Sequence, residues 1–240
     1  MPQLSDMAAF EDDFQVWRKS RAELLLDDFG ELCRYREANA ALPPAGPTGD
    51  RIVFFGDSIT EGWNLEEHFP GKPYLNRGIC AQTTPQMLIR FRPDAIALGA
   101  RVAVILAGTN DIGGNTGAMS LEDIAANLAS MADVARAGGV EAVFSSLLPP
   151  AHGETPASRF NLLKHPLDAV LALNAWLNGY CAEHGLEFID YYSAMSGPDG
   201  LVTPALSEDG LHPTALGYRV MAPLAEAAIA NALKRRSLAF

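Results

Sequence analysis

Short apolar runs separated by helical stretches dominate the pattern of the chain after residue 50. The runs have the length of buried strands and cover residues 52–55, 102–107, 140–147 and 186–189, with a weaker one at 74–76. Helical stretches lie between and after them: one starts at 84–88, and others cover 121–137, 167–184 and 213–234. Strands that alternate with helices predict a mostly parallel sheet with helices on both faces.

The first 49 residues follow a different pattern. From residue 10 to 41, apolar side chains that include Phe14, Trp17 and Phe29 recur at roughly helical spacing, which predicts one long helix or two shorter ones. A stretch rich in proline and glycine at 42–49 then breaks the helical pattern. We therefore expect a helical extension at 1–49 and an α/β domain at 50–240. The extension packs either on this domain or against a second copy, and the sequence leaves both open.

Polar loops follow the first three predicted strands. Gly56-Asp57-Ser58 comes after the first, Asn76-Arg77-Gly78 after the second, and Gly108-Thr109-Asn110-Asp111 after the third. Active sites of open α/β sheets lie outside the carboxyl ends of the strands. We therefore expect the three loops to meet at one edge of the sheet.

A candidate nucleophile and base occur at opposite ends of this domain. Ser58 needs a base within hydrogen-bond reach to attack a carbonyl. His212, in the string Asp209-Gly-Leu-His-Pro, is the candidate base, and Asp209 is placed to fix its tautomer. Ser58 and Asp209 each have a simpler interpretation as a helix cap, but their combination favours a serine hydrolase.

Acyl transfer also needs donors for a developing oxyanion. The backbone N–H groups of Ser58 and Gly78 and the Asn110 side chain are our candidates, although turn or cap roles would explain Gly78 and Asn110 singly. Asp57 and Asp111 are rival acids for the triad, and we expect both to brace their own loops by accepting from nearby backbone amides.

Candidate substrate-binding residues are less sharply defined. The long polar connection at 149–165 carries His152, Arg159 and Phe160, and such loops near a sheet edge often bind substrate. Asp57 adjoins the candidate nucleophile, and Trp63 is either a stacking platform for a carbohydrate or a packing residue. No broad apolar lid is visible in the sequence, which favours a short acyl group such as acetyl.

Composition excludes several classes of function. The formal net charge of −11 disfavours binding to nucleic acid, and no apolar stretch reaches the length of a membrane span. The three cysteines form no CxxC pair and the five histidines show no metal-ligand spacing, so we expect no metal site. The N-terminus has no signal-peptide pattern, which favours a cytoplasmic protein, although a trimmed secretory signal would leave the same sequence.

The ordered blocks Gly56-Asp57-Ser58, Asn76-Arg77-Gly78, Gly108-Thr109-Asn110-Asp111 and Asp209-Gly-Leu-His-Pro213 resemble those of the SGNH hydrolases, or GDSL-type esterases and lipases. The resemblance covers about residues 51–225, with Ile59 in place of the usual leucine. It implies a three-layer α/β/α, flavodoxin-like fold with about five parallel strands. It also implies a serine esterase that needs no cofactor.

The substrate stays open between a small ester and a carbohydrate ester. Arylesterase, thioesterase, lysophospholipase and transacylase activities fit the same residues. A non-catalytic module that binds carbohydrate or lipid is the alternative from another class.

Overall fold

A parallel five-stranded sheet forms the centre of the computed structural model, which describes residues 4–45 and 51–238. The strand order is β2-β1-β3-β4-β5. The predicted strands are confirmed, with small differences at their ends: β1 Ile52–Gly56, β2 Tyr74–Gly78, β3 Val102–Leu106, β4 Glu141–Ser145 and β5 Glu187–Ile189.

The register of the sheet brings three strand ends to the same level. Gly56, the last residue of β1, lies opposite Gly78 of β2 and Leu106 of β3. Every residue of β1 and β3 is buried, as expected for central strands covered on both faces. The loops that follow β1, β2 and β3 therefore leave the sheet side by side at its carboxyl edge.

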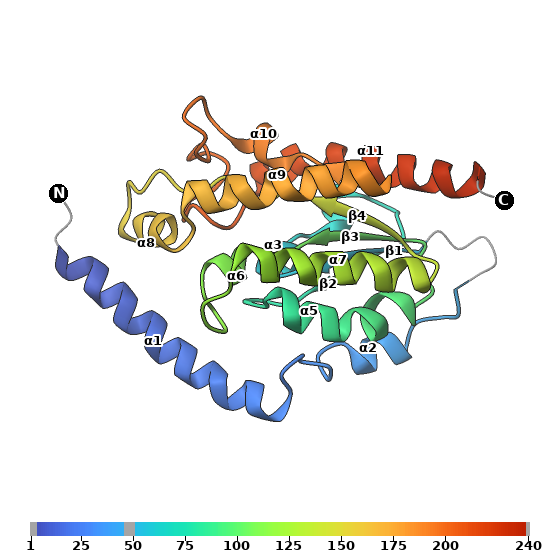
Figure 1. Ribbon diagram of the computed structural model, residues 1–240, viewed down its shortest axis with the longest axis horizontal. Helices are drawn as coiled ribbons and strands as arrows, with labels where there is room; N and C mark the ends of the chain where they lie inside the picture. The colour runs from blue at the N-terminus through green and yellow to red at the C-terminus, as the bar shows by residue number, and fades with distance from the viewer. Residues whose placement is uncertain (1–3, 46–50, 239–240) are drawn as a thin grey trace.

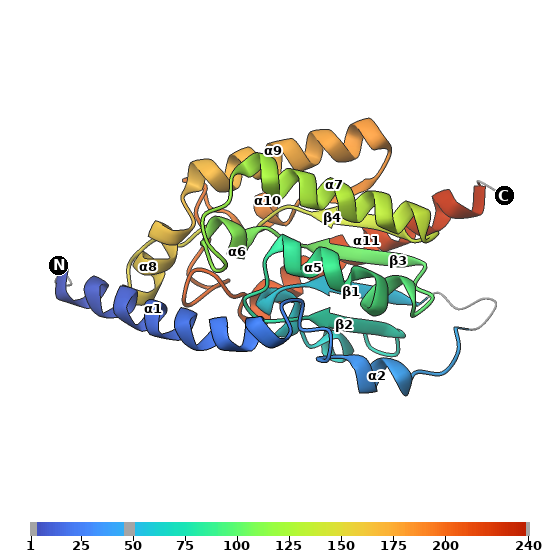
Figure 2. The same cartoon turned by 60° about the horizontal axis from the view of Figure 1, so that its bottom comes forward.

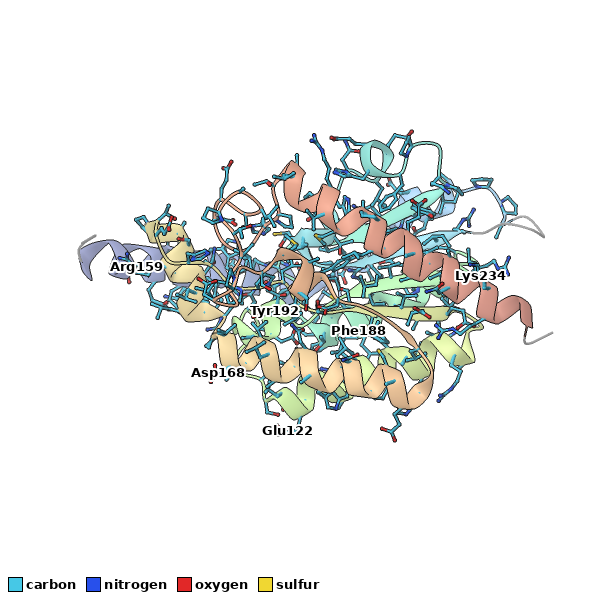
Figure 3. The ribbon with its side chains drawn as sticks, turned by 90° about the horizontal axis from the view of Figure 1, so that it is seen from above. Glu122, Arg159, Asp168, Phe188, Tyr192 and Lys234 are labelled. Atoms are coloured by element: carbon cyan, nitrogen blue, oxygen red, sulfur yellow. The ribbon has the colours of Figure 1, made fainter. Side chains whose placement is uncertain are left out.

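Helices cover both faces of the sheet, which confirms the predicted three-layer fold (Figure 3). Neighbouring β1 residues divide between two apolar cores, because side chains alternate across a strand: Phe55 belongs to one core and Phe54 to the other. The first core is shared with α5 Thr84–Phe91, α7 Leu121–Ala137 and α9 Leu167–His184. The second is shared with α4 Leu65–His68, α10 Tyr191–Met195 and α11 Ala215–Leu238.

Short helices surround the carboxyl edge of the sheet. They are α3 Ser58–Glu61, α6 Thr109–Ile112 and α8 Pro156–Lys164, while the π-helical turn η1 Arg92–Ile96 extends α5. α8 corrects our expectation of a polar connection through 149–165. The Thr155 hydroxyl accepts from the Ser158 N–H at 3.1 Å and proline occupies the first helical position, so a local start signal was present and overlooked. Ser120 caps α7, with its hydroxyl accepting from the Asp123 N–H at 3.1 Å.

The N-terminal extension forms two helices, α1 Leu4–Asp27 and α2 Arg36–Ala40. α1 is a long helix that crosses in front of the carboxyl edge of the sheet and reaches α8 (Figures 1 and 2). Of the helices described for residues 4–45 and 51–238, none combines the length and apolar character that a membrane crossing requires.

Candidate active site

Ser58, His212 and Asp209 form a continuous hydrogen-bonded line at the carboxyl edge of the sheet. Ser58 Oγ lies 2.9 Å from His212 Nε2, and His212 Nδ1 lies 2.7 Å from Asp209 Oδ2. The serine comes from the end of β1, whereas the other two residues come from the loop before α11, more than 150 positions further along the chain. The fold therefore brings together the three residues chosen from the sequence.

A tight turn holds Ser58 at the edge of the sheet. A Cβ atom on Gly56 would lie 2.6 Å from the Leu106 carbonyl oxygen, so only glycine fits where β1 ends. Asp57 Oδ1 then accepts from the Ile59 N–H at 2.9 Å and caps α3. This confirms the expected brace. Burial raises the pKa of Asp57 to about 7.

The loop around Asp209 fixes both carboxylate oxygens. Oδ1 accepts from the N–H groups of Leu211 at 2.9 Å and His212 at 2.8 Å, and Oδ2 faces the imidazole. Burial acts to raise the pKa of Asp209, but these hydrogen bonds outweigh it and hold the pKa well below its usual range. The hydrogen bond with Asp209 in turn raises the pKa of His212. The pair is thus arranged to strengthen the imidazole as a proton acceptor.

The side-chain amide of Asn110 lies beside Ser58, and three neighbours determine its orientation. Its Nδ2 donates to the Gln82 carbonyl at 3.0 Å and more weakly to Asp57 Oδ2 at 3.3 Å. Its Oδ1 accepts from Asn115 Nδ2 at 2.8 Å. The N–H that makes the long contact to Asp57 is the more weakly held of the two and is the candidate donor to a developing oxyanion.

Gly78 is placed differently from our expectation of an oxyanion donor. Its backbone N–H donates to the Asn76 side-chain oxygen at 2.9 Å, and a Cβ atom there would lie 2.1 Å from the Glu61 nitrogen. Gly78 thus allows α3 to pack closely on β2. We expected the glycine to let its backbone approach the substrate, but the close approach is to α3. Our assignment of the Gly78 N–H as an oxyanion donor is corrected, because this N–H already donates to Asn76.

Ala81 is a candidate for a second backbone donor. It lines the cavity next to Ser58, and within the described part of the chain the N–H groups of both residues have no hydrogen-bond partner. Ala81 has a φ of +65°, in the left-handed region that non-glycine residues seldom occupy. Its carbonyl accepts from Asn115 Nδ2 at 3.2 Å. Asn115 therefore contacts both Ala81 and Asn110, and sequence inspection overlooked the two residues at 81 and 115.

A buried guanidinium supports these loops from beneath. Arg90 is fully buried and donates to the carbonyls of Gly56 at 2.9 Å and Arg77 at 2.8 Å, at the ends of β1 and β2. It also donates to the Gln82 side chain at 2.5 Å. Burial lowers the pKa of Arg90 to about 10, so it keeps its charge at neutral pH.

Asp111 joins the third loop to α5. Its carboxylate accepts from the Thr84 N–H at 3.0 Å and from the Thr84 hydroxyl at 2.6 Å. Burial raises the pKa of Asp111 to about 6. The expected brace is therefore present, although it acts on α5 and not on its own loop.

A cavity of about 240 Å³ opens over Ser58. It is lined by the candidate catalytic residues and also by residues of α1 and α8, including Phe14, Trp17 and Phe160, the last of which was a candidate from the sequence. No pattern in the sequence indicated that α1 would line this cavity. The full set of lining residues is Phe14, Trp17, Ser58, Cys80, Ala81, Asn110, Gly113, Asn115, Phe160, Asn161, Lys164, His165, Leu211 and His212.

The remaining predicted substrate-binding residues lie elsewhere. Trp63 is only 3% exposed and packs on Phe54, which corrects its interpretation as a stacking platform, because its ring belongs to the core. His152 lines a separate cavity, and its Nδ1 lies 3.5 Å from Asp199 Oδ2. Arg159, labelled on α8 in Figure 3, donates to the Gly153 carbonyl at 3.1 Å and does not line the cavity over Ser58.

The histidine, cysteine and acidic side chains show no metal-binding arrangement in the described residues. Nowhere among them do three or more such side chains lie close enough together to hold a metal ion. His165 lines the cavity, but burial lowers its pKa and its Nδ1 lies 2.8 Å from the Asn161 carbonyl. The hydrogen-bonded line itself supports chemistry by a serine, an imidazole and a carboxylate.

A parallel α/β sheet with a serine, histidine and aspartate aligned at its carboxyl edge defines a class of serine hydrolase. Residues 54–220 match the model of the GDSL-like lipase/acylhydrolase family, to which this chain belongs. The match covers most of the sheet and the three aligned residues, and it leaves α1 outside.

Solved structures support the same assignment. A GDSL-like lipase from Bacteroides thetaiotaomicron is 38% identical, with a TM-score of 0.78, and the match covers 85% of this chain and 100% of the other. A proposed acylhydrolase from Bacteroides fragilis is 39% identical, with a TM-score of 0.79, and 86% and 99% of the two chains are covered. An acetyl xylan esterase shares the fold at 14% identity, with a TM-score of 0.60 over 74% and 98% of the chains. A search of curated proteins gave no significant match.

Proposed function

We propose that the protein hydrolyses short-chain carboxylic esters through an acyl-enzyme on Ser58. The observation that carries this proposal is the hydrogen-bonded line from Ser58 Oγ through His212 to Asp209, with distances of 2.9 and 2.7 Å. The line opens into a cavity and belongs to a chain of the acylhydrolase family. Asp209 orients the imidazole, and His212 acts first as base and then as acid.

The first half-reaction forms the acyl-enzyme. Ser58 Oγ attacks the ester carbonyl carbon while His212 Nε2 takes the hydroxyl proton, and the carbonyl oxygen becomes an oxyanion. The N–H groups of Ser58 and Ala81 and the Asn110 amide donate to that oxyanion. The tetrahedral intermediate then collapses, the C–O bond to the alcohol breaks, and His212 returns the proton to the departing oxygen.

The second half-reaction releases the acid. A water molecule attacks the acyl carbon while His212 takes one of its protons, and the same donors hold the new oxyanion. The bond between the carbonyl carbon and Ser58 Oγ then breaks, and the proton passes back to Ser58. This sequence restores the enzyme and consumes one water molecule for each ester.

The cavity supports a small substrate. Its volume of about 240 Å³ lies below the roughly 300–1,000 Å³ that is usual for small-molecule sites. Aromatic side chains and the polar side chains of Asn115 and Asn161 line it together. We therefore propose an acetyl or similarly short acyl group on a small or carbohydrate alcohol.

Hydrolysis of p-nitrophenyl acetate by the wild type and by Ser58→Ala tests the proposal. We expect turnover in the wild type and a loss of at least about 10⁴-fold in the variant, because the nucleophile is gone. Circular dichroism confirms that the variant is folded. Comparable turnover in the two folded proteins would remove Ser58 from the mechanism.

A further inference from the structure

The cavity over Ser58 is closed on one side by a helix that lies outside the family match. Phe14 and Trp17 of α1 and Phe160 of α8 line the same cavity as Ser58 and His212. The family model begins at residue 54, so these residues of α1 lie outside it. Their position raises the question of what α1 does for the site.

Contacts with α8 hold the N-terminal part of α1. Glu11 forms an ion pair with Lys164 at 3.2 Å, and the Lys164 ammonium lies 4.3 Å from the centre of the Phe14 ring. Phe14 also packs edge-on against Phe160, with ring centres 5.7 Å apart, and stacks on Trp17 at 5.6 Å. These contacts join an ion pair, a cation–π contact and an aromatic cluster at the edge of the cavity.

A second set of contacts holds the C-terminal part of α1 near the loop that carries Ala81. Arg21 forms an ion pair with Glu31 at 2.8 Å, and both partners are mostly buried. Glu31 in turn accepts from Gln82 Nε2 at 3.1 Å, and the same nitrogen donates to the Gly30 carbonyl at 3.1 Å. Gln82 follows Ala81 directly, so the segment after α1 is bonded to the loop that carries the candidate donor.

We propose that α1 is a fixed wall of the substrate site and that Trp17 and Phe14 limit the size of the ester that fits. This inference rests on the proposed ester hydrolysis and adds the element that sets its selectivity. Because α1 is held at both ends, the aromatic side chains restrict the cavity without a closing movement. The small volume of the cavity is thus a property of α1 as much as of the hydrolase domain.

The test compares p-nitrophenyl acetate with p-nitrophenyl octanoate in full-length variants. Trp17→Ala and the double variant with Phe14→Ala remove the wall, and Trp17→Phe keeps part of it. Val16→Ala is the matched control, because Val16 is the neighbouring residue on α1, is 68% exposed and does not line the cavity. Circular dichroism and size-exclusion chromatography confirm that each variant is folded and has the wild-type oligomeric state.

The quantity measured is the ratio of kcat/KM for octanoate to that for acetate. We expect Trp17→Ala to raise this ratio at least about tenfold, mainly through a lower KM for octanoate, because discrimination by an apolar pocket is about 10–200-fold for each methylene. Trp17→Phe is expected to lie between Trp17→Ala and the control. A ratio in Trp17→Ala within twofold of Val16→Ala, or a fall in the ratio, would overturn the proposal.

A binding measurement separates this inference from the proposed hydrolysis. Calorimetric titration with sodium octanoate and sodium acetate needs no turnover, and we expect Trp17→Ala to bind octanoate at least about fivefold more tightly than Val16→Ala does. Tighter octanoate binding without ester turnover would keep the wall and reject the hydrolase. Turnover that depends on Ser58, with unchanged size preference in both assays, would keep the hydrolase and reject the wall.

Discussion

Asn115 offers a sharp test of how the oxyanion donors are arranged. Its Nδ2 donates to Asn110 Oδ1 at 2.8 Å and to the Ala81 carbonyl at 3.2 Å, so one amide group joins two of the three proposed donors. Asn115 lies five residues after Asn110, outside the block Gly108-Thr109-Asn110-Asp111. Its side chain need not contact the oxyanion to affect the donors. We therefore treat it as a positioning residue and choose Asn115→Ala as the perturbation.

The expected effect follows from these two hydrogen bonds. A neutral hydrogen bond contributes about 1 kcal/mol net, so losing both weakens the donor arrangement by at most about 2 kcal/mol. Since about 1.4 kcal/mol corresponds to a factor of ten, kcat should fall about 10–30-fold. Removing a direct oxyanion donor costs about 10²–10³, and the Gln82 carbonyl still holds the Asn110 amide at 3.0 Å, so the loss should stay below that range.

Steady-state hydrolysis of p-nitrophenyl acetate measures this loss and separates kcat from KM. We expect KM to change by less than about threefold, because donors to the oxyanion act mainly in the transition state. Asn115→Asp should be more damaging than Asn115→Ala, since it places a carboxylate against two oxygen acceptors. Asn64→Ala is the control, because Asn64 caps α4 away from the cavity. A kcat for Asn115→Ala within twofold of this control would refute the reasoning.

Three further substitutions test other parts of the account. Asp209→Asn removes the acceptor that raises the pKa of His212, so the fall in kcat/KM on acidification should move to lower pH. A pH profile of kcat/KM from pH 5 to 9 measures this shift, and an acidic limb at the wild-type pH would contradict the prediction. Arg90→Met leaves the buried carbonyls of Gly56 and Arg77 unpaired and should lower the free energy of unfolding by about 3–5 kcal/mol, measured in urea, whereas a loss below about 1 kcal/mol would contradict the supporting role. Ala81→Gly should raise the urea midpoint, because a left-handed alanine costs about 1–2 kcal/mol and the added glycine flexibility costs about 0.5–1 kcal/mol; a lower midpoint would contradict a strained Ala81.

The sheet and the aligned triad residues were predictable because their signals are local. The central strands β1 and β3 are short apolar runs, and burial on both faces removes the need for alternation. Asp209 and His212 are three residues apart in one tight loop, so their contact can be predicted without information from the rest of the chain. Ser58 follows the end of β1 directly, and parallel topology places such ends together.

We chose Gly78 as the backbone donor because glycine is the residue type that allows close approach, whereas the donor that we now propose is Ala81. Gly78 drew attention as the residue that tolerates close approach, yet what approaches it is the backbone of α3. Ala81 adopts a conformation that its residue type disfavours, and surrounding contacts such as the hydrogen bond from Asn115 hold it there. Local propensity cannot reveal a conformation that tertiary contacts impose.

The role of the aromatic residues also depended on distant contacts. Trp63 and Trp17 both lie in helical or loop segments with apolar neighbours, and nothing local distinguishes them. Trp63 packs among the rings of Phe54 and Tyr218, whereas Trp17 reaches the cavity because α1 crosses the edge of the sheet (Figure 2). The path of α1 is set by contacts with α8 and with the segment before α5, which no periodicity encodes.

Locating the covalent adduct of a serine-directed inhibitor tests most directly the central claim that Ser58 is the nucleophile. The full-length protein is treated with a short-chain fluorophosphonate, which reacts with an activated serine, and the adduct is located by mass spectrometry of its peptides. We expect a single adduct on Ser58, formed more slowly when an excess of ester substrate is present during labelling and strongly reduced in His212→Ala, because the imidazole activates the hydroxyl. An adduct on another residue, or none on Ser58 in a protein that hydrolyses esters, would contradict the account.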